Sequence, residues 1–561
     1  MVNSIIFFLS HIMKILAFNV SHDSSVAYID NGELKFFCKE ERVSKVKRDK
    51  QPFKSLEIFR NNFDVKLDEC LYLTPSNNEP LGEYMYGEYV SKCFNIELTN
   101  YSSLLHHTCH ASLAFFNSKF DTALVFVVDR NGSIFFINAL PAARESESVY
   151  IASKDNGLTP IYKNYHLMND ERRKHLIEKT IQDSFPKSCL VRARSLYSIV
   201  MMYEAATTLI GQNQLENGKT MGLSSYCNNI EFPTLTNDDG IVDNRYFQSS
   251  DDYGDKAVCF IDCETNITQN VTPNNHMYYA EKAKHVQIES QNAVLNLISK
   301  YVGETGINNV CIVGGYGLNV VANNHYVKNL PNVNFYFEPV SDDTGISVGA
   351  AMLRHFEKTN TAPQPLTDNF YHYYDNTELL KIGKPSDLSE ICDLIIAQKS
   401  VAIFEGNPES GPRALGHRSI LFDARNKDCK DLVNKIKNRE WYRPFAGIIL
   451  EDHFEEYFET LGLKKSEYMT INFHAKENAK KLAPGIIHVD GTCRIQTVSK
   501  GFIYELLKEF YKKTGCPMIL NTSFNLAGQP LVQTKADAVE VHKNSLLDAV
   551  FFVDDNKILL K

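Results

Sequence analysis

The stretch SLLHHTCHASLAFF at residues 103–116 is rich in side chains that can bind a metal ion. His106 and His110 are four residues apart, so on a helix their imidazoles lie on one face and can bind one ion together. His107 points about 100° away on the same helix. Because this spacing also occurs in helices that bind nothing, the stretch alone leaves a metal site and a merely histidine-rich helix both open.

Two aspartates elsewhere in the chain are candidates to complete such a site. Asp129 follows the apolar run TALVFVV, and Asp343 lies in SDDTGISVGAA just before a helical pattern. Carboxylate combined with imidazole suits Fe²⁺, Zn²⁺ or Mn²⁺ better than Mg²⁺, which favours oxygen ligands. The alternative for each aspartate is a helix cap or a turn residue, which is the commoner role.

A second group of residues is basic and lies in glycine- and proline-bearing segments. Its members are Arg413 and Arg418 in GPRALGHRS, Lys437, Arg439 and Arg443 in KIKNREWYRPF, and Arg494 in DGTCRIQTV. Arginine forks bind phosphate oxygens bidentately, so this set suits a triphosphate or an acyl phosphate. Ser523 and Asn525 in NTSFN add a hydroxyl and an amide at a strand end, where α/β proteins bind ligands. A solvated charged surface is the alternative for any one cation.

A third motif is VGGYGLNVVAN, which follows a buried-type strand. Gly314 and Gly315 would let a ligand approach the backbone, and Asn319 could hydrogen-bond it, although a plain tight turn explains the glycines equally well. The motif has neither the GxGxxG spacing of a dinucleotide fold nor the GKS or GKT ending of a P-loop. The segment ENGKTMGL is not a P-loop either, because Asn213 stands where the first glycine should be.

The elements that must position these residues follow an α/β pattern. Apolar runs at KILAFNV, SSVAYID and ELKFFCK predict strands, and Asn31-Gly32 predicts a hairpin between the last two. TALVFVV and NNVCIV predict buried strands, with helices from about Leu318 and over SVGAAMLRHF. These units predict mixed sheets covered by helices. The polar, proline-bearing segment 357–399 predicts a boundary between two domains, at 13–365 and 385–561.

Bulk composition excludes several classes of protein. With 561 residues, 43% of them hydrophobic, and a net charge of −9, the chain is neither disordered nor a protein that coats nucleic acid non-specifically. Thirteen cysteines without a CxxC pair are typical of the reducing cytoplasm. The apolar run in the first twelve residues is too short to span a membrane, and these residues are either an upstream extension or an over-called start, with Met13 as the true first residue. We therefore expect no membrane association.

Ten segments in order from Met13 resemble one family. They are HDSS, EER, HHTCHA, GKTMGL, GGYGLNVVAN, DDTGISVGAA, GPRALGHRSI, KNREWYRPFA, DGTCRIQTV and LNTSFNLAGQPLV. Together they resemble the NodU/CmcH/TobZ family of O-carbamoyltransferases. The resemblance implies an N-terminal ASKHA (actin-like ATPase) domain similar to TsaD, followed by a YrdC-like α/β domain. It also implies that the second domain makes carbamoyl adenylate from carbamoyl phosphate and ATP, with Mg²⁺, and that the first transfers the carbamoyl group to a hydroxyl of a small-molecule or nucleotide acceptor.

The resemblance assigns roles to individual residues. It implies metal ligands at His106, His110, Asp129 and Asp343, with iron favoured, and a nucleoside site at Gly314, Gly315 and Asn319. It implies a carbamoyl phosphate and ATP site at Arg413, Arg418, Lys437, Arg439, Arg443, Arg494, Ser523 and Asn525, with Lys437, Arg439 and Arg443 also catalytic. His22 in HDSS is a hypothetical general base, and turn filler is the alternative. His107 and Cys109 are then expected to orient or pack the helix.

The chain also departs from the family pattern. Arg130 and Asn131 stand between Asp129 and Gly132, where a small Gly-x-Gly turn is usual, and Asn407, Pro408, Ser410 and His417 depart in the GPRALGHRS region. Because of these changes, the acceptor cannot be assigned to this chain from the family resemblance. Two other functions stay open: a tRNA threonylcarbamoyladenosine-type enzyme, which the acidic pI opposes, and a non-catalytic nucleotide-binding module, which predicts loss of the ligands and cations.

Overall fold

The computed structural model describes residues 13–561, except for 75–79, 102–104, 139, 169–170, 229–232, 238–239, 251–256, 262–270, 376 and 378–380. The first twelve residues, which the sequence suggests are an upstream extension, lie outside the described residues. None of the helices that the structure describes has the length and apolar character needed to span a bilayer.

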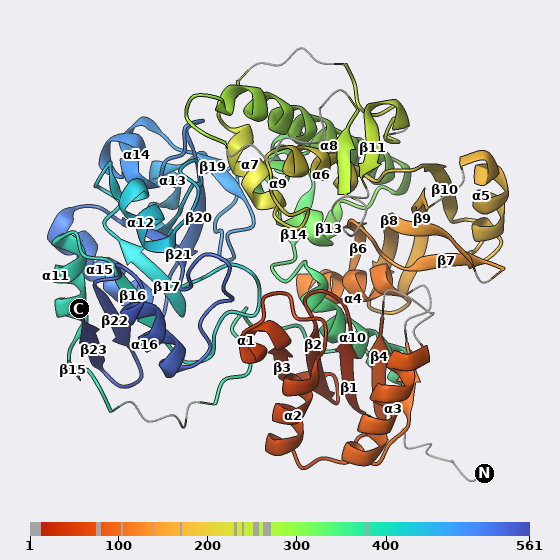
Figure 1. Cartoon of the computed structure of the whole chain (residues 1–561), viewed down its shortest axis with the longest axis horizontal. Helices are drawn as coiled ribbons and strands as arrows, with labels where there is room; N and C mark the ends of the chain where they lie inside the picture. The colour runs from red at the N-terminus through yellow and green to blue at the C-terminus, as the bar shows by residue number, and fades with distance from the viewer. Residues whose placement is uncertain are drawn as a thin grey trace, which may run out of the picture.

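The first sheet has the strand order β3-β2-β1-β4-β5 (Figure 1). Its strands are β1 (Lys14–Asn19), β2 (Ser25–Asp30), β3 (Glu33–Lys39), β4 (Glu69–Leu73) and β5 (Leu98–Asn100). β1 pairs antiparallel with β2 and parallel with β4. Asn31 and Gly32 connect β2 to β3 with φ values of 51° and 79°, which confirms the predicted hairpin. Helices α1 (Glu40–Ser44), α2 (Phe53–Asn62) and α3 (Pro80–Phe94) belong to this part of the chain.

The second sheet repeats this topology, with the order β10-β9-β8-β6-β13-β14 and β7 paired to β8. Its strands are β6 (Thr122–Val128), β7 (Ile134–Ile137), β8 (Leu140–Ser153), β9 (Gly157–Leu167), β10 (Leu190–Ser195), β13 (Asn309–Val313) and β14 (Asn334–Phe337). As in the first sheet, an antiparallel meander (β6, β8, β9) precedes two strands that run parallel to its first strand. The sequence shows no repeat, so the duplication exists at the level of topology alone.

Two helices lie between these sheets. Helix α10 (Ile346–Thr359) packs on β1 and β2, whereas α4 (His106–Ser118) packs on β6 and β13. The two helices are in backbone contact, because a Cβ added to Gly349 of α10 would lie 2.0 Å from the carbonyl oxygen of Cys109 in α4. The position of the histidine-bearing helix is therefore fixed by close packing on one side and by a sheet on the other.

The other face of the second sheet is covered by a separate group of helices. β6 alternates, with Ala123, Val125 and Val127 in the core around α4, and Leu124, Phe126 and Val128 in a second core. The covering helices are α6 (Ile199–Leu209), α7 (Asn217–Ser224), α8 (His276–Thr305) and α9 (Val320–Asn329), and the peripheral elements are α5 (Lys174–Gln182), β11 (Phe247–Ser250) and β12 (Ala257–Phe260). Because both of its faces are buried, β6 is apolar from Ala123 to Val128, as expected for a buried strand.

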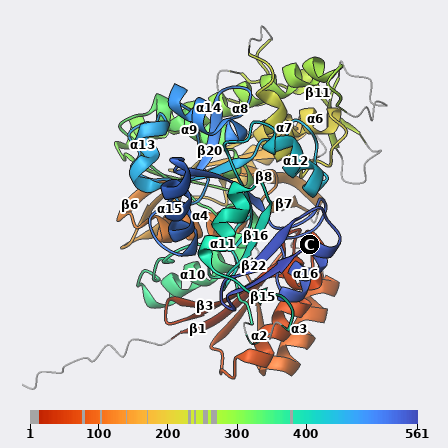
Figure 2. The same cartoon turned by 90° about the vertical axis from the view of Figure 1, so that its left-hand side faces the viewer.

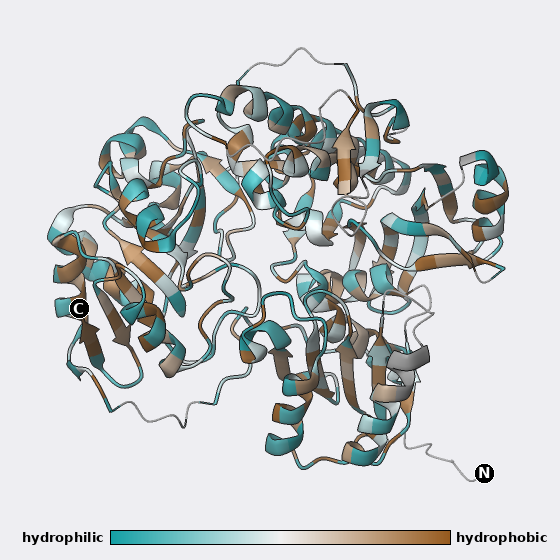
Figure 3. Ribbon diagram, viewed as in Figure 1, coloured by the Kyte–Doolittle hydropathy of each residue, from teal (hydrophilic) through white to brown (hydrophobic). Residues whose placement is uncertain are grey.

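The C-terminal half contains a nine-stranded sheet with the order β15-β23-β22-β16-β17-β21-β18-β20-β19 (Figure 1). This half of the chain faces the viewer in Figure 2. Its strands are β15 (Lys384–Pro385), β16 (Val401–Phe404), β17 (Arg418–Phe422), β18 (Ala446–Leu450), β19 (Asn472–His474), β20 (Thr492–Val498), β21 (Met518–Ser523), β22 (Ala549–Phe552) and β23 (Lys557–Leu560). Its helices are α11 (Leu388–Ile396), α12 (Cys429–Lys437), α13 (Phe454–Tyr457), α14 (Glu477–Leu482), α15 (Phe502–Thr514) and α16 (Lys535–Lys543). Hydrophobic residues concentrate on the sheet strands (Figure 3).

These sheets confirm the mixed α/β class predicted from the sequence. The domain limits of 13–365 and 385–561 stay a prediction. The two halves are in direct contact: Asn323 and Asn324 of α9 donate to the carbonyl oxygens of Thr470 and Asn472, at 2.8 Å and 2.7 Å. A site that uses residues of both halves is therefore possible.

Candidate metal centre and anion pocket

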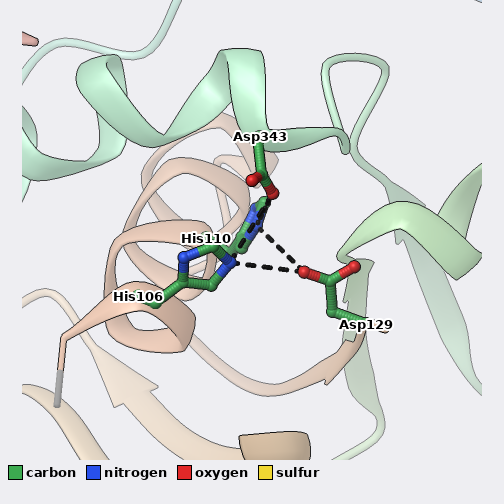
Figure 4. Close-up of side chains that lie close together, drawn as sticks. All are labelled: His106, His110, Asp129 and Asp343. Atoms are coloured by element: carbon green, nitrogen blue, oxygen red, sulfur yellow. Dashed lines mark hydrogen bonds and ion pairs between the residues drawn. The ribbon is translucent and has the colours of Figure 1, made fainter. Parts of the chain in front are cut away.

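The four predicted metal ligands converge between α4, β6 and α10 (Figure 4). His106 Nε2 lies 3.3 Å from Asp129 Oδ2 and 3.6 Å from Asp343 Oδ1. His110 Nε2 lies 3.8 Å and 3.6 Å from the same two oxygens. One ligand atom from each of the four residues lies within 4.8 Å of the others, and all four residues are buried. The structure thus brings together the whole set expected from the sequence.

Each aspartate directs one oxygen at the histidines and engages the other elsewhere. Asp129 Oδ1 accepts from the backbone amides of Arg130 (2.8 Å) and Gly315 (3.2 Å). Asp343 Oδ2 accepts from Ser21 Oγ at 3.0 Å. The remaining oxygens, Asp129 Oδ2 and Asp343 Oδ1, are those that face the imidazoles. Hydrogen bonds to the outer oxygens therefore fix the orientation of both carboxylates.

The donor set fits a divalent transition metal ion. His110 Nδ1 has no hydrogen-bond partner among the described residues, and Nε2 lies beyond hydrogen-bond distance of both carboxylates. Burial alone would raise the pKa of Asp129, but the hydrogen bond with His106 and the nearby histidine charges lower it below its usual range. Two imidazoles and two ionised carboxylates around one point are a ligand set for iron, zinc or manganese.

The neighbouring histidines have other roles. His107 points away from the group, and its Nδ1 lies 2.8 Å from Ser148 Oγ. His22 Nδ1 lies 3.3 Å from Asp23 and 3.7 Å from Asp343. Burial would lower the pKa of His22, but these two carboxylates raise it to about 9. A protonated imidazole cannot accept a proton. His22 therefore suits the role of general base only when a cation bound to Asp343 offsets the negative charge of that carboxylate.

A cavity of about 500 Å³ lies between the two halves of the chain, with Asp129 and Asp343 in its wall. Its wall also contains most of the other residues expected from the sequence, namely His22, Arg413, Lys437, Arg439, Arg443, Arg494, Ser523, Asn525, Gly315 and Asn319. The metal-binding group and the basic residues are therefore parts of one site, although the sequence places them in different halves.

The cations in this wall are held close together and away from water. Lys437 Nζ donates to Ser523 Oγ and Asn525 Oδ1, both at 2.9 Å, and contacts the Ser523 carbonyl oxygen. Burial, together with Arg439 and Arg443, lowers the pKa of Lys437 well below its usual value. Burial and the charge of Arg413 lower the pKa of Arg494 in the same way. Like charges in a buried wall are unfavourable until an anion enters, so the cavity is suited to a polyanion.

Three predicted residues occupy positions that differ from the expectation. Arg418 is absent from the cavity wall: its guanidinium lies 3.6 Å above the Phe404 ring and donates to the carbonyl oxygens of Glu405 and Gly406. Gly314 is also absent from the wall. Its φ is +90°, and a Cβ added there would lie 2.5 Å from the carbonyl oxygen of Val128, so this residue is a glycine that a tight turn requires. Asn319 lines the cavity, but its side chain accepts from the Ala322 amide and so caps α9.

The sequence interpretation did not include six further cations of the same wall, namely Lys39, Arg42, Lys47, Arg48, Arg130 and Lys219. Lys39 is buried with Asp23 at 3.0 Å, and Lys219 reaches the second half by pairing with Glu440 at 2.7 Å. Arg130 pairs with the buried Glu204. Lys219 lies in the quoted GKTMGL segment and Arg130 was noted as a departure, but nothing in the sequence shows that these side chains face a cavity.

The two halves match two family models. The model described as Carbamoyltransferase N-terminus matches residues 83–352, and the model described as Carbamoyltransferase C-terminus matches residues 392–558. An uncharacterized protein of Methanocaldococcus jannaschii is 28% identical, over 94% of this chain and 96% of its own. Nodulation protein NolNO of Sinorhizobium fredii is 26% identical, over 94% of this chain and 78% of its own. Nodulation protein U of the same species is 32% identical over 42% of this chain and 43% of its own.

Among solved structures, full-length HypF in its phosphate- and nucleotide-bound form is 14% identical, covers 61% of this chain and 55% of its own, and has a TM-score of 0.36. A likeness this low carries no argument.

The candidate metal ligands beside a basic cavity define a site suited to a polyanionic ligand. The ordered match of both models shows that the chain belongs to the carbamoyltransferase family, which confirms the resemblance and supports a carbamoyltransferase enzyme.

Proposed function

We propose that this carbamoyltransferase is an ATP-dependent O-carbamoyltransferase. In this proposal the second half, a YrdC-like domain, forms carbamoyl adenylate from carbamoyl phosphate and ATP, with Mg²⁺. The first half, an ASKHA-type domain similar to TsaD, then transfers the carbamoyl group to a hydroxyl. The observation that supports this most strongly is the cavity of about 500 Å³ whose wall contains both aspartates of the candidate metal site and five of the six cations predicted from the sequence.

The residues of the cavity fit the two activated anions. In this proposal water first cleaves carbamoyl phosphate to carbamate and inorganic phosphate, and a carbamate oxygen then attacks the α-phosphorus of ATP and displaces pyrophosphate. Lys437, Arg439 and Arg443 would bind the phosphate oxygens of both substrates and stabilise the two anions released. Ser523 and Asn525 hold the Lys437 ammonium by hydrogen bonds, so it points in one direction before substrate enters. The adenylate carries AMP as leaving group, which makes it a better carbamoyl donor to an alcohol.

The transfer step is assigned to the metal-binding group. A divalent ion held by His106, His110, Asp129 and Asp343, with iron implied by the resemblance, would supply Lewis-acid stabilisation of the charge that develops as AMP departs. His22 lies in the cavity wall beside Asp343, where it can take the acceptor's hydroxyl proton. We propose a small-molecule or nucleotide acceptor and, from the absence of CxxC pairs among thirteen cysteines, a cytoplasmic location.

Pyrophosphate release from ATP tests this proposal. Release that depends on carbamoyl phosphate supports it, whereas release that requires threonine and bicarbonate supports the tRNA threonylcarbamoyladenosine-type alternative. A chain that releases no pyrophosphate with either set of substrates contradicts adenylate formation. Mass spectrometry of candidate hydroxyl compounds after incubation would then identify the acceptor by its carbamoyl adduct.

A further inference from the structure

A buried ion pair lies behind the metal-binding group, in the second sheet. Glu145 of β8 and Lys163 of β9 are both 1% exposed, and the Lys163 ammonium contacts Glu145 Oε1 and the Tyr150 hydroxyl. Neither residue lines the cavity, so neither can touch the substrates. Burying two charges costs free energy that apolar residues of similar size would not. The pair therefore calls for an explanation other than stability.

The pair is connected to the first turn of α4. Ser148 Oγ donates to Glu145 Oε1 at 3.1 Å and lies 2.8 Å from His107 Nδ1. Because the Ser148 hydroxyl donates to Glu145, it accepts from His107 Nδ1, which fixes the orientation of that ring. His107 directly follows the ligand His106. The N-cap residue Leu105 offers no side-chain cap, but the His106 amide donates to Ser133 Oγ at 3.3 Å, and this bond and the His107–Ser148 contact together hold the first turn.

The same strand holds the turn that carries Asp129. The Asp129 amide donates to the Ser146 carbonyl oxygen at 2.9 Å, and the Gly132 amide donates to the Glu145 carbonyl oxygen at 2.7 Å. A Cβ added to Gly132 would lie 2.7 Å from the His107 ring and 2.8 Å from Glu145 Oε2. The turn thus packs directly on the side chains of His107 and Glu145. Two segments that bear metal ligands meet on one buried carboxylate.

We propose that Glu145 and Lys163 are positioning residues for the metal-binding group. Lys163 fixes the Glu145 carboxylate, which in turn fixes His107 through Ser148 and supports the turn at Gly132. The spacing between His106 and Asp129 is set by these contacts. The inference rests on the proposed function only in that the four ligands bind a metal ion. Residues behind metal ligands typically change metal affinity by about 10–100-fold when they are replaced.

Cobalt titration of the full-length chain tests this inference. We expect Lys163→Met, Glu145→Gln and the double variant each to bind Co²⁺ about 10–100-fold more weakly than the wild type, with shifted d–d absorption bands because the ligand geometry changes. The double variant leaves no unpaired buried charge, so its free energy of unfolding without metal should stay close to that of the wild type. Lost affinity with retained stability would separate positioning from folding.

A matched control is available in the second half. Lys535 is 6% exposed and pairs with Asp555 at 2.7 Å, so Lys535→Met also breaks a lysine ion pair and should leave Co²⁺ affinity unchanged. A double variant with wild-type affinity and spectrum would overturn the inference while leaving the proposed function in place. An affinity that falls only in proportion to the unfolded fraction would overturn it as well. A wild-type chain that binds no Co²⁺ would refute both the metal site and the inference.

Discussion

Replacing Lys437 by alanine should separate substrate binding from folding in the basic wall of the cavity. Lys437 is the last residue of α12, and its ammonium is held 2.9 Å from both Ser523 Oγ and Asn525 Oδ1. Arg439 and Arg443 lie close enough to lower its pKa together with burial. The charged form of Lys437 is therefore disfavoured in the free protein and favoured once an anion is bound.

The expected size of the effect follows from these contacts. A hydrogen bond between a charged donor and its acceptor contributes about 1.5–3 kcal/mol, so its loss to a phosphate oxygen should lower kcat/KM for pyrophosphate release by about 10–150-fold. Removing one of several like charges relieves repulsion with Arg439 and Arg443, which offsets the packing lost on truncation. The free energy of unfolding should consequently change little, in contrast to the activity.

A coupled assay of pyrophosphate release, with ATP and carbamoyl phosphate varied in turn, measures this prediction. Lys435→Ala is the matched control, because Lys435 belongs to the same helix, carries the same charge and is exposed to solvent. If Lys437→Ala keeps kcat/KM within about threefold of the wild type, or if the control loses as much, the assignment of this lysine to phosphate binding is wrong.

Three further predictions concern the fold and the metal-binding group. Gly349→Ala should destabilise the chain by about 1–3 kcal/mol or more in urea unfolding, because the new Cβ would lie 2.0 Å from a backbone oxygen of α4. Gly303→Ala, with nothing within 4 Å, should instead be neutral or stabilising, and equal effects would argue against the backbone contact. His110→Ala should abolish Co²⁺ binding and carbamoyl transfer but spare pyrophosphate release. The control His175→Ala, at an exposed histidine, should spare all three. If His110→Ala also loses pyrophosphate release, adenylation and transfer are not separate steps. Burial raises the pKa of Glu338 from 4.5 to about 7. The neutral carboxyl therefore contributes up to about 3 kcal/mol of stability, which is fully present below pH 4.5 and is lost as the pH rises through about 7. Unfolding of Glu338→Gln measured from pH 4 to 8 should lack this loss, and an unchanged pH dependence would show that another group causes it.

Local sequence pattern was enough to predict the elements that depend on spacing alone, and it left the metal site open. ALVFVV is apolar at every position because β6 is buried on both faces, and Asp129 follows where that strand ends. His106 and His110 lie together because four residues make about one helical turn. The convergence of Asp343 on this pair was an expectation from family resemblance, since no local pattern links a residue more than two hundred positions away.

The direction of a side chain was the main property that the sequence could not supply. Arg418 lies in the same kind of cation-bearing loop as Arg413, yet it begins β17, and the register of that strand turns its guanidinium onto Phe404 and away from the cavity. Lys219 faces the cavity only because α7 packs against the other half, where Glu440 is its partner. Both positions are decided by tertiary packing, which residue type and spacing do not encode.

The turn after β6 shows how a departure from the family pattern can leave the ligands intact. Arg130 stands where the family resemblance implies a small residue. Its Nε pairs with Glu204 and its NH2 group donates to Gln214 at 3.0 Å, so the side chain is held in the cavity wall. The backbone of the turn still presents Asp129 Oδ2 to the histidines, because Asp129 Oδ1 accepts from the Gly315 amide and Gly132 stays packed on Glu145. Arg130 therefore forms part of the surface that faces the cavity, while Asp129 still directs Oδ2 at the histidines.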